Sequence, residues 1–201
     1  LNEARQEIHF DLWAAHVNHL LRGDESERDE AFVRDTAARY GIPFFLERAN
    51  VTQYAAARGL SLQHAGRDIP YRFLSEIADR EGYARIATAH NLDDQIETFI
   101  LRLIKGSGLR GLSSIPPARD RIIRPFLEVY RSEIMSFAQD HAISYVEDSS
   151  NAKTVYERNY IRHRIMPLCD DLNPAFREKI AALLGDIHAV NAVFDKKKDA
   201  F

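Results

Sequence analysis

Cysteine is nearly absent from this sequence, in which Cys169 is the single cysteine among 201 residues. One cysteine excludes a disulfide within the chain and any metal cluster that several thiolates would hold. Long apolar runs are missing too, since no stretch approaches the ~20 apolar residues that cross a bilayer, and the first residues do not have the pattern of a signal peptide. Together these absences favour a cytoplasmic protein that has no membrane partner.

The sequence also lacks a large excess of either charge, because its formal net charge is −3. This value excludes a uniformly basic nucleic-acid binder, but the charges are unevenly distributed. Residues 102–131 carry seven Lys or Arg against two acidic residues, whereas the first fifty residues lean acidic. A basic face on a mildly acidic protein suits a polyanionic partner that docks in one orientation. An ordinary solvated surface would give the same pattern.

The apolar residues alternate along the chain between the spacing of strands and the spacing of helices. The expected strands cover residues 10–17, 44–51, 84–89 and 122–127, and the expected helices cover 24–40, 61–82, 92–104, 132–141 and 158–168. This alternation predicts an α/β fold with a Rossmann-like parallel sheet, flanking helices and a helical tail. We expect a nucleotide-binding, catalytic domain over residues 1–168 and a helical tail or linker toward further domains over 169–201.

Two of these helical segments carry an apolar stripe. In the helix over 92–104 the stripe consists of Leu92, Ile96, Phe99, Ile100 and Leu103. In the tail it consists of Ala175, Phe176, Ile180, Leu183, Leu184 and Ile187. The tail is expected to pack on its own domain, and pairing with a second copy in a homodimer is the alternative.

The most informative polar cluster lies at residues 90–98, where an apolar strand hands over to a helix. This segment holds His90 and three carboxylates within nine residues. Ligands in α/β sheets gather at the carboxyl ends of strands, which favours a binding role. Acidic residues in the first turn of a helix are also favoured by the helix dipole, so a purely structural role stays open.

Six segments, in the same order along the chain, resemble motifs of the tRNA(Ile)-lysidine synthetases. They are AHVNHLLRG at 15–23, HNLDDQIET at 90–98, GSGLRGL at 106–112, RPFLEV at 124–129, EDSSN at 147–151 and RNYIRH at 158–163. That family belongs to the N-type ATP pyrophosphatases, which have an adenine-nucleotide α-hydrolase-like Rossmann fold.

The resemblance implies an ATP-dependent ligase that acts in two steps. The C2 carbonyl oxygen of the wobble cytidine of tRNA(Ile) attacks the α-phosphate of ATP, and pyrophosphate leaves. The ε-amine of free L-lysine then attacks C2, and AMP departs to leave lysidine. ATP with Mg²⁺ is the implied cofactor, and tRNA(Ile) and free lysine are the implied partners.

The resemblance also implies roles for individual residues. The implied catalytic residues are Asp94, Arg162 and His90. Asp94, with Asp93 beside it, would recognise the lysine amine. Arg162 would stabilise charge on the adenylated intermediate. The implied ATP-binding residues are His16, Val17, His90, Gly106 and Gly108. The implied tRNA phosphate contacts are Arg110, Arg124 and Arg158.

Purely structural roles are alternatives to several of these assignments. His16 and His19 are three residues apart, which invites a zinc interpretation, but a strand end does not place both on one face and no third ligand is near, so no metal site is predicted there. His90 could be a hydrogen-bonded core histidine. Arg162 could form a surface ion pair with Glu157 or Asp148, which would contribute little.

Two departures from the family pattern matter. The family begins with a glycine-rich SGGxDS loop that cradles pyrophosphate, and no such segment occurs here, so we expect this polypeptide alone not to turn over ATP. Pro70 replaces a helical arginine of the family, so the helix is expected to kink there or to begin there. Arg67 or Arg72 could supply the missing charge.

Two other functions remain open. One is a different ATP pyrophosphatase, such as a tRNA thiolation enzyme, although those that thiolate cytidine need several cysteines. The other is a non-catalytic tRNA-docking or dimerisation module.

Overall fold

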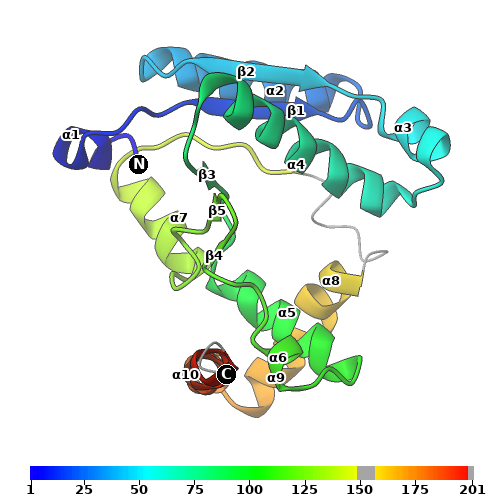
Figure 1. The fold of residues 1–201 in the computed structure, drawn as a ribbon, viewed down its shortest axis with the longest axis vertical. Coiled ribbons are helices and arrows are strands. Elements are labelled where there is room, and N and C mark those ends of the chain that lie inside the picture. Colours follow the sequence, from blue (N-terminus) through cyan, green and yellow to red (C-terminus); the bar gives the residue numbers. More distant parts are fainter. Residues whose placement is uncertain (149–156, 199–201) are drawn as a thin grey trace. The chain divides into compact units, whose positions relative to one another are not determined.

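The computed structural model describes residues 1–148 and 157–198 (Figure 1). The chain divides into two compact units, Leu1–Ile86 and Ala87–Phe201. A domain that ends at residue 168 stays a prediction. Among the described residues no helix is long and apolar enough to cross a membrane.

The first unit is a parallel strand pair with helices. Its elements are α1 (Ala4–Ile8), β1 (Ala14–Asn18), α2 (Asp24–Arg39), β2 (Phe44–Arg48), α3 (Val51–Arg58) and α4 (Leu62–Glu81). The strands β1 and β2 run parallel, in a register that pairs Ala14 with Phe44 and Asn18 with Arg48. The α/β alternation predicted for this part of the chain is therefore confirmed, with helix α2 connecting the two parallel strands.

Helices α3 and α4 pack on each other through small and branched side chains. Val51, Ala55, Ala65 and Ile69 form a buried cluster between them. Helix α3 was not predicted from the sequence. Its start is fixed by the Asn50 side chain, which accepts a hydrogen bond from the amide of Gln53 at 3.0 Å. Such a cap satisfies one of the amides that a helix start leaves unpaired.

Helix α4 runs through Pro70. A start of the helix at Pro70, one of the two expectations, is wrong, because Ser61 caps the helix by accepting from the amide of His64 at 3.2 Å. Arg72 is held by Glu76 at 2.9 Å and by Glu47. Arg72 is therefore already neutralised by two carboxylates within this unit.

A buried polar network fastens the carboxyl end of β1. Asn18 and Glu30 are each only 1% exposed. Asn18 Nδ2 donates to Glu30 Oε2 at 2.9 Å, and Arg48 donates to the same carboxylate from Nε at 2.9 Å and from a terminal nitrogen at 2.8 Å. The hydrogen bond from Arg48 is the largest cause that lowers the pKa of Glu30 to about 2. The network joins β1, α2 and β2 at the edge where ligands of α/β sheets bind.

Leu20 follows this network in an unusual backbone conformation. Its φ is +54°, in the left-handed region that is costly for a residue with a side chain. The Leu20 amide donates to Asn18 Oδ1 at 3.0 Å. The side chain of Leu20 is 47% exposed. The turn after β1 is therefore strained, and Asn18 holds it.

The second unit is mainly helical. Its elements are β3 (Ile86–Ala87) at the boundary, α5 (Leu92–Ile104), α6 (Leu109–Leu112), β4 (Ala118–Arg119), β5 (Ile122–Ile123), α7 (Arg131–Asp140), α8 (Glu157–Tyr160), the π-helical segment η2 (Ile161–Ile165), α9 (Met166–Leu172) and α10 (Phe176–Lys198). The helix expected over 92–104 is confirmed at both ends. The RNYIRH motif lies on α8 and η2, whereas Ser149–Asn151 of the EDSSN motif lie outside the described residues.

The strands of the second unit differ from the expectation. The strand predicted over 84–89 is reduced to β3, which pairs with β5 in a three-stranded sheet of order β3-β5-β4. The strand predicted over 122–127 stops at Ile123, because a turn begins at Arg124, whose carbonyl accepts from the Leu127 amide at 3.2 Å. Strands β4 and β5 are antiparallel and meet at Asp120, whose φ of +53° suits a tight hairpin turn.

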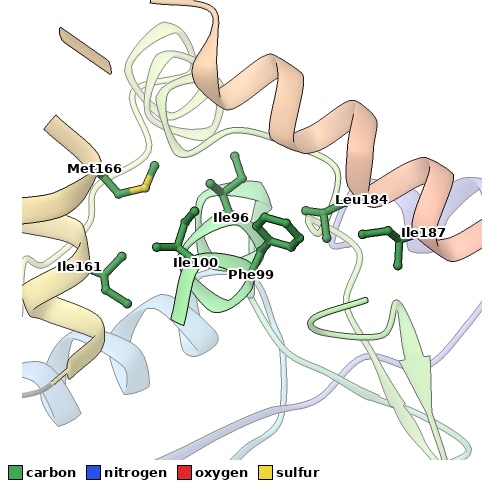
Figure 2. Close-up of a cluster of buried hydrophobic side chains, with 7 residues drawn as sticks. All are labelled: Ile96, Phe99, Ile100, Ile161, Met166, Leu184 and Ile187. Atoms are coloured by element: carbon green, nitrogen blue, oxygen red, sulfur yellow. The ribbon is translucent and has the colours of Figure 1, made fainter. Parts of the chain in front are cut away.

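The core of the second unit forms around α5 (Figure 2). Seven buried side chains meet there from α5, η2, α9 and α10: Ile96, Phe99, Ile100, Ile161, Met166, Leu184 and Ile187. The tail therefore packs on its own unit, as expected. Leu103 was expected in the core stripe, but it is 52% exposed, because the last turn of α5 extends beyond this cluster.

A widened helical turn connects α8 to α9. The π-helical segment Ile161–Ile165 precedes Pro167, which cannot donate a helical hydrogen bond and would clash with the carbonyl four residues earlier. A π-helical turn next to a proline accommodates this conflict. Such turns are frequent at functional sites, and this one carries Arg162.

Candidate functional site

The start of α5 fixes the orientation of Asp94. Asn91 Oδ1 accepts from the Asp94 amide at 3.0 Å, and Asp94 Oδ2 accepts from the Asn91 amide at 3.0 Å. This reciprocal capping box confirms the structural role expected for an acidic residue in the first helical turn. It leaves Asp94 Oδ1 available to other partners.

Glu97 and Arg162 form the centre of the candidate site. Glu97 is 3% exposed, and Arg162 binds it with two hydrogen bonds, from Nε to Oε1 at 2.6 Å and from Nη2 to Oε2 at 2.9 Å. Arg162 Nη2 also lies 3.3 Å from Asp94 Oδ1. Burial raises the pKa of the Glu97 carboxyl, against the opposing hydrogen bond from Arg162.

Arg158 joins the same cluster from one turn earlier. Its Nη2 donates to the Asp94 carbonyl at 3.0 Å and to Thr98 Oγ1 at 2.7 Å, and its Nε lies 3.3 Å from Glu97 Oε2. Arg158 was expected to contact tRNA phosphate, but here its guanidinium faces the carboxylates of its own unit. The expected ion pair of Arg162 with Glu157 is wrong, since Arg162 binds α5 and Glu157 accepts from Lys105 at 2.5 Å.

Asp93 has partners from two other helices. The amide of Arg131, at the start of α7, donates to Asp93 Oδ2 at 2.7 Å. Arg177, from the start of α10, donates to Asp93 Oδ1 at 2.5 Å and to Asp170 at 2.8 Å. Asp93 thus fixes the starts of α7 and α10 against α5.

Two hollows open beside this cluster. The larger hollow measures about 440 Å³ and is lined by Asp93, Tyr130, Arg131, Ser132, Met135 and Arg177. The smaller hollow measures about 200 Å³ and shares Asp93, Arg131 and Arg177 with the larger one. It is lined in addition by Glu97, Arg162 and the buried Met166. The candidate site is therefore a charged corner, formed by Asp93, Glu97, Arg131, Arg162 and Arg177, to which Met166 adds an apolar side chain.

His90 lies just before this corner and is half-buried. Its Nδ1 lies 3.0 Å from Thr88 Oγ1, but the half-buried side chain does not occupy the core position that the alternative of a core histidine requires. A contact of His90 with nucleotide stays a prediction.

The structure separates Gly106 and Gly108 from the carboxylates. Both glycines follow the end of α5, whereas Asp93 and Asp94 lie at its start, and a helix of 13 residues is about 20 Å long. Gly106 has a φ of +73°, and Gly108 precedes α6 as its N-terminal cap residue. These local roles explain the two glycines, and their contact with ATP stays a prediction.

The remaining cations differ in exposure. Arg110, on α6, is exposed, and its contact with tRNA phosphate stays a prediction. Arg124 is only 7% exposed, and its guanidinium donates to the Pro116 carbonyl at 2.7 Å. Arg124 therefore supports the loop before β4, and its low exposure leaves little of the guanidinium open to a phosphate.

His16 and Val17 belong to β1 in the first unit. Burial lowers the pKa of both His16 and His19, which favours neutral imidazoles at neutral pH. Over residues 1–148 and 157–198 no group of three or more His, Cys, Asp or Glu side chains could hold a metal ion. The zinc interpretation of His16 and His19 therefore finds no third ligand.

Sequence reasoning gave no role to two residues that complete the corner. Glu97 lies three residues after Asp94, a spacing that places both on one helix face, so a signal for it existed. Arg177 lies 84 residues from Asp93, and no local pattern could have joined them.

Comparison with known proteins supports the resemblance seen in the motifs. Residues 1–169 match the family model of the PP-loop domain. A tRNA(Ile)-lysidine synthase of Bacteroides thetaiotaomicron is 37% identical over 186 residues, which are 92% of this chain and 44% of that protein. One of Clostridioides difficile is 35% identical over 202 residues, 100% of this chain and 44% of that protein. The chain thus spans less than half the length of these two relatives.

A solved structure shares the fold. The U34-tRNA thiolase NcsA from Methanococcus maripaludis, solved with its [4Fe-4S] cluster, superposes with a TM-score of 0.69 at 17% sequence identity, over 92% of this chain and 64% of that one. At this identity the likeness concerns the fold alone. Because the family model covers most of its length, this chain belongs to the PP-loop domain family, whose members have an ATP-binding α/β fold.

Proposed function

We propose that this chain is the nucleotide-binding, catalytic part of an ATP-dependent ligase that joins free lysine to C2 of the wobble cytidine of tRNA(Ile). The observation that carries the proposal is the pair Asp94 and Glu97, which share Arg162 on one face of α5, with Glu97 lining the smaller hollow. Two carboxylates at this spacing suit a ligand ammonium. The lysidine synthases that align with nearly the whole chain support the same reaction.

Within this proposal, Asp94 and Glu97 hold the ε-ammonium of lysine. The amine must lose a proton before it attacks C2. Glu97 is the proton acceptor, because burial raises the pKa of its carboxyl and so makes the carboxylate a stronger base. Arg162, whose guanidinium lies between both carboxylates, is positioned to bind phosphate oxygens of the adenylated intermediate.

ATP supplies the adenylate that turns the C2 oxygen of cytidine into a leaving group. His16 and Val17 would frame its adenine, since a half-buried neutral imidazole suits hydrogen bonding better than the neutralisation of phosphate charge. At the start of α5, as in the rest of the described chain, no group of three or more His, Cys, Asp or Glu side chains could hold a metal ion. No step is assigned to Mg²⁺ there.

The tRNA would be bound in part by Arg110, the exposed member of the three predicted phosphate contacts. Arg158 acts instead as a positioning residue, since it holds Glu97 and the first turns of α5. A homodimer and a cytoplasmic location stay predictions.

The test uses the protein encoded by the complete reading frame that contains this chain. Purified protein is mixed with tRNA(Ile), ATP and radiolabelled lysine, and both pyrophosphate release and lysine incorporation are followed. We expect tRNA-dependent incorporation in the wild type. The variant Glu97→Gln should lose about 100-fold in lysine incorporation, as expected for a charged hydrogen bond, yet still release pyrophosphate.

The matched control is Asp186→Asn, which removes an exposed carboxylate of α10 in the same unit. Its incorporation rate should equal that of the wild type. Binding of tRNA with no dependence on ATP or lysine, and no incorporation, would favour the docking module instead.

A further inference from the structure

The larger and smaller hollows together offer charges of both signs to a ligand. They share Asp93, Arg131 and Arg177, so the two spaces adjoin at one negative and two positive side chains. Glu97 lines the smaller hollow but not the larger one. A ligand that reached from Glu97 to the shared corner would meet an anion at one end, and an anion beside two cations at the other.

Arg131 and Arg177 both have hydrogen-bonding capacity to spare. The backbone amide of Arg131 binds Asp93, whereas its exposed guanidinium forms no ion pair with another residue in the described part of the chain. Arg177 uses one N–H of each of its three nitrogens on Asp170 and Asp93. A guanidinium carries five N–H groups, so two remain.

Asp93 can also take a further ligand. Each of its oxygens accepts one hydrogen bond, from the Arg131 amide and from Arg177. A carboxylate oxygen has a second lone-pair site, so Asp93 can accept from an ammonium group as well. The shared corner therefore pairs an acceptor for a cation with donors for an anion.

We propose that this corner binds the α-ammonium and α-carboxylate of the free amino acid. Arg131 and Arg177 take the carboxylate, Asp93 takes the α-ammonium, and the apolar Met166 contacts the methylene stem that leads to Glu97. The inference rests on the proposed function, because that function places the ε-amine at Asp94 and Glu97. A phosphate group fits less well, since it would lie against the Asp93 carboxylate.

This arrangement selects a complete amino acid over a simple diamine. Cadaverine carries the same distal amine and a similar stem, but it has no carboxylate. It would use Glu97 and gain nothing from Arg131 or Arg177. The charged hydrogen bonds to the carboxylate should therefore appear as a difference in affinity between lysine and cadaverine.

The experiment compares these two ligands on the complete protein and on Arg131→Gln. Equilibrium binding is measured by calorimetry, and lysine incorporation is measured in parallel. We expect Arg131→Gln to weaken lysine binding about tenfold and to leave cadaverine binding unchanged. Arg177→Lys, which keeps a positive charge for Asp93 and Asp170 but has fewer donors, should act in the same direction.

Arg119→Gln is the matched control, because Arg119 is exposed on β4 and its ion pair there is with the adjacent Asp120. It should not alter binding of either ligand. An equal loss for lysine and cadaverine in Arg131→Gln, or wild-type protein that binds both equally, would overturn the inference. Selective lysine binding without any incorporation into tRNA would instead refute the proposed function and leave the amino-acid site standing.

Discussion

Removal of the buried charge of Glu30 should destabilise the first unit far more than removal of the exposed charge of Glu27, which binds the same Arg48. Glu30→Gln keeps the size of the side chain but discharges a carboxylate that is 1% exposed. It accepts hydrogen bonds from Asn18 and Arg48. Loss of one partner of a buried ion pair costs 3–5 kcal/mol. Because the amide oxygen still accepts from Asn18, we expect about 3 kcal/mol.

Glu27→Gln provides the control. Glu27 accepts from the same Arg48 at 2.7 Å, but its side chain is 50% exposed, so its removal should cost less than about 1 kcal/mol. Urea unfolding followed by the fluorescence of Trp13, the single tryptophan, reports on this unit, since Trp13 stacks on Phe45 with ring centroids 5.3 Å apart. Equal costs for the two variants would refute the reasoning.

The pH dependence gives a second check on Glu30. The network lowers its pKa from 4.5 to about 2 in the folded protein. A lowered folded-state pKa means that the stabilisation is complete above about pH 4.5 and is lost as the pH falls through 2. The stability difference between wild type and Glu30→Gln should therefore shrink across this interval. A constant difference down to pH 2 would contradict the assignment.

Three further outcomes are expected. Leu20→Gly should raise stability by up to about 1 kcal/mol in the same fluorescence assay, because glycine relieves the left-handed strain at a half-exposed side chain. Ile96→Ala should cost about 3 kcal/mol by the cavity it leaves in a fully buried position, measured by circular dichroism, whereas Leu183→Ala, at 42% exposure, should cost less than about 1. Arg110→Ala should weaken tRNA binding and lower the salt slope of log K by about one, measured by filter binding, and an unchanged slope would exclude a phosphate contact.

Local sequence signals predicted the helices well where they agreed with one another. Helix α5 was placed correctly because its apolar spacing extends over the whole segment and two acidic residues mark its first turn. Helix α3 was missed although Asn50 and Gly59 bound it, since its eight residues carry too short an apolar pattern. In the hairpin of β4 and β5, β4 was not predicted, because a strand of two residues is too short to show an alternation of apolar and polar residues.

The acidic residues of α5 stood out because they follow one another in the sequence. No local pattern joins them to their counter-charges, since Arg162 lies 65 residues after Glu97 and Arg177 lies 84 after Asp93. The family resemblance pointed to Arg162, and nothing in the sequence pointed to Arg177. Tertiary packing of η2 and α10 against α5 brings them together. For the same reason Arg158 was interpreted as an outward-facing cation, although the packing of α8 turns it inward.

The corner at the start of α5 is electrically balanced as it stands. Asp94 and Glu97 already face the guanidinium groups of both Arg162 and Arg158. An incoming ammonium must therefore take the place of a resident cation, so its affinity depends on competition and not on net attraction. The same exchange releases the guanidinium of Arg162, which can then bind the phosphate oxygens of the adenylated intermediate. Binding of the amine at this corner is therefore coupled to stabilisation of the intermediate that the amine attacks.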